Sequence, residues 1–145
     1  MRVSPNLIIG ALITATVLVA GYVGIQKFDK SLCSLEVIRR TPSPDGRLEA
    51  VLFQRNCGAT TDFATNLSVV RTGRVISSLA GNLLIADSNH GRAPLDSGYV
   101  VHVSVEWIAS DSLMVRYDAR ARLFKKELRA NGVSVVYHAI GEGGA

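Results

Sequence analysis

The fold is decided by residues 100–107, which read Val-Val-His-Val-Ser-Val-Glu-Trp. Every second residue from Val101 to Trp107 is apolar and the residues between them are polar, so the apolar side chains share one face of an extended strand. Trp107 continues the valine face, which favours a place in the core over a role as a binding aromatic. His102 lies on the polar face, where solvent exposure is favoured over a role as a ligand.

Similar period-two segments lie on both sides of this strand. Asn131-Gly132 separates the last two of them and is typical of a tight hairpin, because both turn residues need a positive φ. Ser43-Pro44-Asp45-Gly46 is typical of a type I turn. The spacing predicts a mainly β domain built as an antiparallel sheet, a sandwich or a small barrel, with no amphipathic helix. The expected strands are residues 48–55, 67–71, 83–86, 100–107, 113–117, 123–130 and 133–139.

The N-terminal part of the chain has a different character. Leu7 to Ile25 holds nineteen consecutive residues without a charge. As a helix this run is about 28 Å long, close to a hydrocarbon core of about 30 Å. It predicts a single-pass transmembrane anchor; a cleaved signal peptide and a buried soluble helix are the alternatives. The expected organisation is a tail and anchor in 1–30, a β-rich soluble domain in 31–139 and a flexible tail in 140–145.

Two cysteines, Cys33 and Cys57, bear on the side of the membrane that the domain occupies. A bridge between them would close a loop of about 25 residues, and such bridges persist outside the cytosol. Two unrelated buried thiols are the alternative. Lys27 and Lys30 favour a cytoplasmic domain by the positive-inside rule, but long domains translocate largely regardless of charge. We therefore expect the domain on the extracytoplasmic, periplasmic side.

Composition limits the partners. The formal charge of the chain is +4, part of which belongs to residues beside the N-terminal run, and aromatic residues make up 6%. Neither value favours nucleic acid, which single-stranded binders contact through stacking aromatics. Basic residues concentrate between 116 and 129, where they could face anionic headgroups, dock an acidic partner or form a solvated strand face. These residues are Arg116, Arg120, Arg122, Lys125, Lys126 and Arg129.

Three segments carry a resemblance to a known family. They are SPDGRLEAVLFQRNCGATTDFAT (43–65), GNLLIADSNHGRAP (81–94) and VEWIASDSLMVRYDARARLFKKE (105–127). Together they resemble a family of small uncharacterised bacterial proteins with an N-terminal membrane or lipoprotein anchor. The similarity covers most of the soluble domain. The resemblance implies an anchored β domain and no assigned activity.

Two polar loops interrupt the β pattern, and functional residues concentrate in loops on a rigid scaffold. One is 57–62 and the other is 86–92. A thiol enzyme would use Cys57 as nucleophile, His90 as base and Asp87 or Asn89 to orient the base. The candidate functional residues of the two loops are Thr60, Thr61, Asp62, Asp87, Asn89, His90 and Arg92.

Two other interpretations of these loops remain. Asp87, Asn89 and His90, with Asp62, could hold a metal, although the spacing matches neither a closed zinc site nor a calcium loop. In the structural interpretation Asp87, Ser88 and Asn89 cap a turn through local amides, Gly91 has a positive φ and His90 is a surface ring. No metal or cofactor is expected.

The expected function follows from one anchor, one domain and no complete catalytic set. We expect a membrane-anchored cell-envelope protein that acts as a non-catalytic binding or structural module. It would contact the lipid bilayer through Leu7 to Ile25 and an envelope protein through its domain. An envelope hydrolase or thiol enzyme using Cys57, His90 and Asp87 is the alternative.

Overall fold

The computed structural model describes residues 10–22, 33–58, 63–76 and 80–141, and the chain forms two compact units, Met1–Cys33 and Ser34–Ala145. In the first unit, residues 10–22 form a helix whose large apolar side chains are exposed. The Thr14 and Thr16 hydroxyls donate to carbonyl oxygens four residues earlier, at 2.6 and 2.9 Å. This bonding satisfies both hydroxyls within the helix.

The run from Leu7 to Ile25 extends beyond this helix at both ends, into residues outside the described part. Within the described residues, no helix combines the length and the apolar character needed to cross a membrane.

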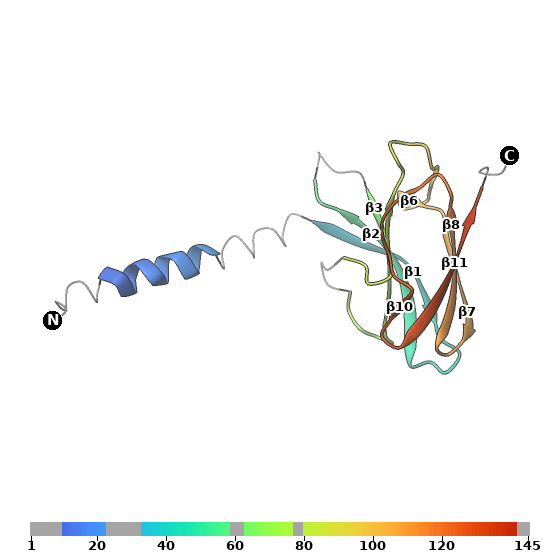
Figure 1. The fold of residues 1–145 in the computed structure, drawn as a ribbon, viewed down its shortest axis with the longest axis horizontal. Coiled ribbons are helices and arrows are strands. Elements are labelled where there is room, and N and C mark those ends of the chain that lie inside the picture. Colours follow the sequence, from blue (N-terminus) through green and yellow to red (C-terminus); the bar gives the residue numbers. More distant parts are fainter. Residues whose placement is uncertain (1–9, 23–32, 59–62, 77–79, 142–145) are drawn as a thin grey trace. The chain divides into compact units, whose positions relative to one another are not determined.

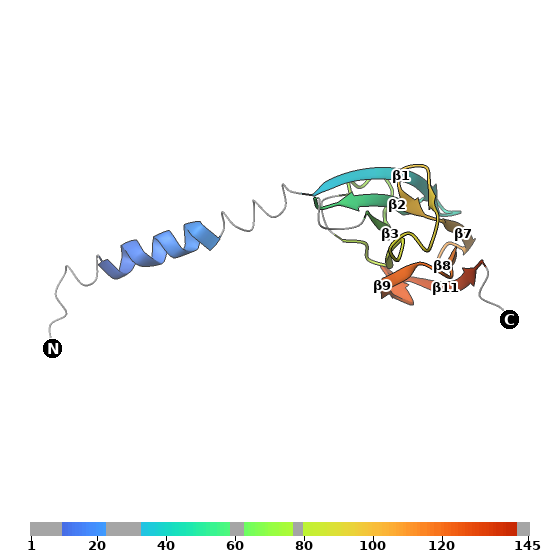
Figure 2. The same ribbon diagram turned by 90° about the horizontal axis from the view of Figure 1, so that it is seen from above.

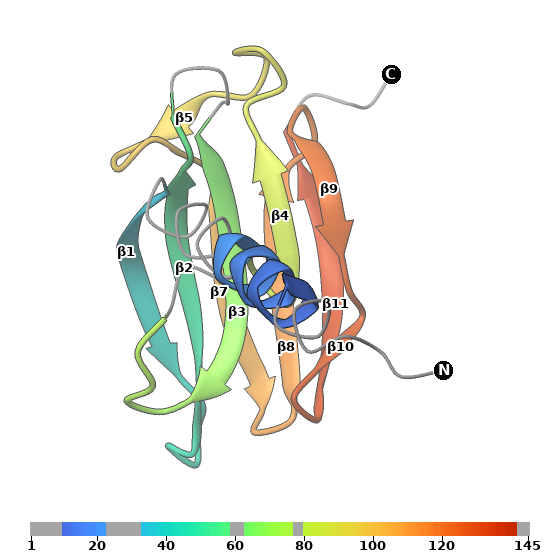
Figure 3. The same ribbon diagram turned by 90° about the vertical axis from the view of Figure 1, so that its left-hand side faces the viewer.

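The second unit is built from β-strands. Five of them form one sheet in the order β1-β2-β3-β4-β9, which Figure 3 shows face on, and four form a second sheet in the order β10-β11-β8-β7. A short ribbon, β5-β6, completes the set. The strands are β1 Ser34–Pro42, β2 Leu48–Asn56, β3 Ala64–Arg71, β4 Leu84–Asp87, β5 Leu95–Asp96, β6 Val100–Val101, β7 Val103–Ala109, β8 Ser112–Asp118, β9 Arg122–Lys126, β10 Arg129–Ala130 and β11 Val133–Ile140.

The two main sheets face each other as the layers of a sandwich. Figure 2 shows β1 and β2 in one layer and β8 and β11 in the other. Alternate residues of both sheets point inward, among them Leu52 and Leu67 from the first and Leu113 and Val115 from the second, and all four are buried in one cluster. The mainly β prediction is therefore confirmed for the described residues.

The strand from which the prediction started has the expected faces. Val101 and Val103 are buried, and Val105 and Trp107 pack against the core. The Trp107 Nε1–H donates to the Thr41 carbonyl oxygen at 2.9 Å. Because Thr41 lies in β1 and Trp107 in β7, this bond joins the edge strands of the two sheets. Trp107 lies against the core, as predicted, but is only partly buried.

The predicted turns also form. Gly46 N–H donates to the Ser43 carbonyl oxygen at 2.9 Å, which closes the turn between β1 and β2. Asn131 and Gly132 have φ values of 50° and 82°, and Ala130 pairs with Val133 across them. Ser43 and Arg47 also hydrogen-bond the Asp45 carboxylate and hold its pKa down, at about 2.

Several boundaries differ from the expectation. The expected strand 100–107 is interrupted at His102, so that β6 pairs with β5 and β7 begins the edge of the second sheet. The expected strand 123–130 is likewise two strands, because the chain passes from the first sheet to the second after β9. β11 continues to Ile140, which pairs with Asp118, so the expected tail begins too early. The rest of that tail, 142–145, is outside the described residues.

The sequence pattern also missed two strands, β1 and the two-residue β5, and one pairing direction. β1 has exposed and half-buried residues without clean alternation, and a register shift between Val37 and Arg39 disrupts its period. β11 pairs with β8 in parallel, whereas only antiparallel pairs were expected. The chain leaves β8, crosses to the first sheet as β9 and returns through β10, which brings β11 alongside β8 in the same direction. Figure 1 shows β8 and β11 side by side.

The two cysteines form a disulfide. Cys33 directly precedes β1 and Cys57 directly follows β2. The first residue of β1, Ser34, pairs with the last residue of β2, Asn56. The bridge therefore fastens the outermost strand of the first sheet to its neighbour, at the point where the chain enters the sandwich. The expectation of a bridge is confirmed, and the alternative of two separate thiols is wrong.

Candidate functional site

The loop after β4 is organised by a buried carboxylate. Asp87 is 3% exposed, and its side chain accepts hydrogen bonds from both Nε and Nη2 of Arg122 in β9. The backbone N–H of Asn89 donates to the same carboxylate at 2.8 Å. Burial opposes ionisation of Asp87, but these hydrogen bonds outweigh burial and hold its pKa below the ordinary value. The carboxylate is consequently a charged anchor for the loop.

Three successive residues of this loop have a left-handed backbone. Asn89, His90 and Gly91 have φ values of 52°, 57° and 82°. The Ser88 hydroxyl accepts the Gly91 N–H at 3.0 Å, and the Asn89 side chain donates to the Arg120 carbonyl oxygen at 3.2 Å. Left-handed φ is uncommon for residues other than glycine, so this turn depends on the bonds that hold it.

The structural interpretation of the loop is therefore correct for most of its residues. Asp87 and Ser88 bond local amides, and Gly91 has the expected positive φ. Asn89 differs, because its side chain reaches the β8–β9 connection instead of a local amide. His90 is an exposed ring, as expected, but its Nε2 lies 3.3 Å from Nη1 of Arg122.

The catalytic interpretation loses its nucleophile. Cys57 is bonded to Cys33, so its sulfur is not a thiolate and cannot attack a substrate. Thr60, Thr61 and Asp62, which share its loop, lie outside the described residues. Arg92 is exposed at the end of the other loop and lines none of the hollows described below.

For a metal, the described ranges contain no group of three or more His, Cys, Asp or Glu side chains that could hold an ion. His102 is placed 2.8 Å from an Asp96 oxygen through its Nδ1, and both side chains are about half exposed.

Most of the basic residues between 116 and 129 have internal partners. Arg116 pairs with Glu106 at 3.0 Å. Arg120 donates to the Asp118 carboxylate through two nitrogens, at 3.0 and 2.8 Å, and lowers the pKa of Asp118 against the effect of burial. Lys126 lies over the rings of Tyr117 and Tyr137, with its Nζ 5.5 and 5.3 Å from their centroids. These charges stabilise the sandwich and leave little of the run for an outside partner.

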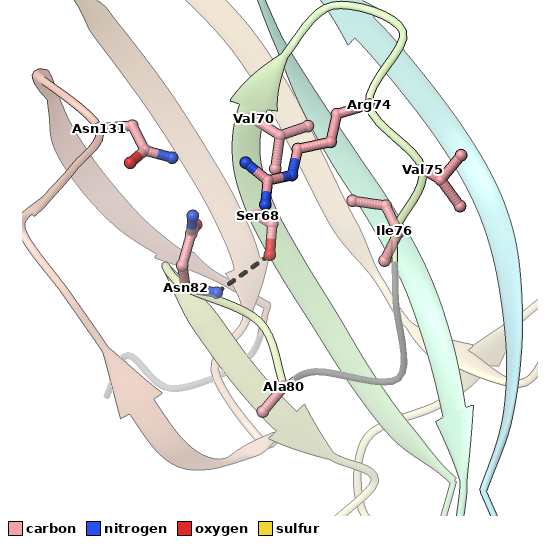
Figure 4. A pocket seen from close by; sticks show the side chains of 8 residues that line it. All are labelled: Ser68, Val70, Arg74, Val75, Ile76, Ala80, Asn82 and Asn131. Carbon is pink, nitrogen blue, oxygen red and sulfur yellow. Dashed lines mark hydrogen bonds between the residues drawn. The ribbon is translucent and has the colours of Figure 1, made fainter. Parts of the chain in front are cut away.

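A groove that the sequence did not reveal lies beside β3. Three hollows of about 200, 390 and 660 Å³ adjoin there, and Asn131 lines all three. We call them together the Asn131 groove. Arg74 lines the first two, and Arg71 lines the second and third. In Figure 4 the Arg74 side chain reaches across to Val70 and Ser68, with its guanidinium on the side toward Asn131.

The groove exists because β4 is short. β4 pairs with β3 only as far as Leu67, and beyond that point two asparagine side chains replace the missing strand. Asn82 accepts the Val69 N–H at 2.9 Å and donates to the Val69 carbonyl oxygen at 2.8 Å. Asn131 donates to the same carbonyl oxygen at 2.7 Å. A side-chain amide satisfies the backbone hydrogen-bonding groups of β3 but fills less space than a neighbouring strand would, so a hollow remains.

No protein-family model, no curated protein and no solved structure matches this chain. The resemblance in the three segments stays a prediction, and a function has to be argued from the residues themselves.

Proposed function

We propose that this protein is a single-pass, membrane-anchored module of the cell envelope, whose extracytoplasmic β-sandwich binds a protein partner without catalysing a reaction. The observation that carries the proposal is the Cys33–Cys57 disulfide. Disulfides persist in oxidising compartments and are rare in the cytosol. The same bond occupies the sulfur that a thiol enzyme would need, so one feature supports the location and argues against a thiol enzyme.

The proposed anchor is supported by the first unit. Leu7 to Ile25 holds no charge, and the large apolar side chains of the helix at 10–22 are exposed, as lipid contact requires. Leu12, Val17 and Leu18 are each more than 60% exposed. Thr14 and Thr16 have their hydroxyls bonded within the helix, which lowers the cost of placing them in hydrocarbon.

The loop at 86–92 gives no support to the alternative function, an envelope hydrolase or thiol enzyme. Asp87 would have to orient His90, but its carboxylate is held by Arg122 and the Asn89 amide. The His90 ring lies beside Arg122 instead, with its Nε2 3.3 Å from Nη1 of the guanidinium.

Fractionation of cells tests the anchor. The full chain is expected in the membrane fraction, resistant to alkaline carbonate and released by detergent. Ile13→Arg with Val17→Arg is expected to move a large part of it to the soluble fraction, because an arginine near the bilayer centre costs about 3 kcal/mol on insertion scales. Leu128→Arg is the matched control, since Leu128 is a similarly exposed apolar residue of the second unit. Wild-type chain released without detergent would contradict the anchor.

Crosslinking in intact cells tests the binding role. A reproducible crosslinked species is expected for the wild-type chain and for Asp87→Asn, because no chemistry at the loop is required. Recovery of no reproducible partner across crosslinkers of different reach would count against a binding module.

A further inference from the structure

The Asn131 groove combines charge with apolar surface. Arg71 and Arg74 have no carboxylate within ion-pair distance among the described residues. Arg40, by contrast, is paired with Glu49. Glu49 also accepts the Gly73 N–H at 3.2 Å, so this nearby carboxylate is already neutralised. The two guanidinium groups therefore give the groove an uncompensated positive charge.

The apolar part of the groove lies beside these cations. Val70 and Ile76 line the first hollow together with Val75, which is 83% exposed, the most of any large apolar side chain described. Leu48 lines the second and third hollows. An exposed apolar patch beside unpaired arginines is typical of a binding surface, because a ligand can cover the apolar patch while it neutralises the arginines.

The groove is elongated. It extends from Ile76 in the first hollow, past Asn131, to Val133 in the third. Arg47 lines the third hollow together with Asp111, so arginine side chains line all three hollows. A series of hollows with arginines along it suits an extended acidic chain better than a compact headgroup.

We propose that the Asn131 groove binds an extended acidic segment of a partner protein, with a carboxylate held by Arg71 and Arg74 and a neighbouring apolar side chain against Val70 and Val75. Guanidinium groups match carboxylates bidentately, which gives direction as well as charge. This inference rests on the proposed binding role, and it identifies the surface and the chemistry of the partner.

The test measures binding of a labelled peptide, Leu-Glu-Val-Glu-Leu with blocked ends, to the full chain in nanodiscs of neutral lipid. The glutamine counterpart of the peptide is expected to bind at least tenfold more weakly. Arg71→Gln with Arg74→Gln is expected to weaken binding of the acidic peptide at least tenfold, and the matching pair of lysine substitutions by a smaller factor. Arg92→Gln is the matched control, since Arg92 is an exposed arginine outside the groove, and should change binding less than twofold.

Three outcomes of the peptide measurement would overturn the proposal: equal binding of both peptides, undiminished binding by the double glutamine variant, or displacement of the acidic peptide by vesicles of anionic lipid. The last result would assign the arginines to a membrane surface. The melting temperature of each variant shows that it is folded. If crosslinking in cells still captures a partner with the double glutamine variant, the groove proposal fails while the proposed binding function stands.

Discussion

Asp87→Asn is expected to lower the free energy of unfolding by about 2 kcal/mol at pH 7. The asparagine Oδ1 can still accept from the Asn89 amide and from Nε of Arg122, so the loss is confined to the bond from Nη2 to Oδ2 and to the charge of the carboxylate. A fully buried pair would lose more when broken, but Arg122 is 41% exposed and solvent screens part of the interaction.

A double-mutant cycle isolates the pair. Asp87→Asn, Arg122→Gln and the double variant are compared by equilibrium unfolding of the full chain in urea. We expect a coupling energy of about 1–2 kcal/mol. The matched control is the Asp45–Arg47 pair, where Arg47 is 83% exposed and the coupling is expected to be smaller. Coupling at Asp87 no larger than at Asp45 would refute the view that this carboxylate organises the loop.

The remaining predictions concern pH, the disulfide and the sandwich edge. The pKa of Asp87 is lowered in the folded state, so its ionised carboxylate stabilises the fold above the unfolded-state pKa of about 3.9, and this stabilisation is lost as pH falls through the folded-state pKa. In urea unfolding below pH 4, the free energy of unfolding should therefore fall less with pH for Asp87→Asn than for the wild type. Cys33→Ser with Cys57→Ser should cost about 3.5 kcal/mol by the loop-closure model, or about 15 °C in Tm; calorimetry showing less than a third of this would contradict the account. Trp107→Phe should lower the free energy of unfolding by about 1–2 kcal/mol through loss of the bond to Thr41. If the variant is as stable in urea as the wild type, this bond does not hold the sheet edges together.

The sequence was most informative where one face of a strand is buried and the other is exposed to solvent. The alternation ending at Trp107 and the Asn131-Gly132 turn were both recognised because they are local signals. β1 was missed because its edge position leaves most residues exposed and its bulge breaks the period. The parallel pairing of β11 with β8 depends on a crossover through the other sheet, which no local pattern records.

The candidate site shows the same division. The turn chemistry of Asp87 and Ser88 is local and was anticipated. The pairing of Asp87 with Arg122 joins residues 35 positions apart, so it required the neighbouring strands β4 and β9 to be known. The Asn131 groove depends on where β4 ends, and the sequence presented Asn131 only as a turn residue.

Thiol labelling in intact cells tests the central claim most directly, because it reports the location of the domain and the state of its sulfurs together. On intact spheroplasts, a membrane-impermeant maleimide should leave the wild-type chain unmodified. After a reductant and a mild denaturant have opened the bridge, the same reagent should label both cysteines of the chain. Modification without reductant, or modification that appears only after the membrane is lysed, would contradict an extracytoplasmic domain closed by the Cys33–Cys57 disulfide.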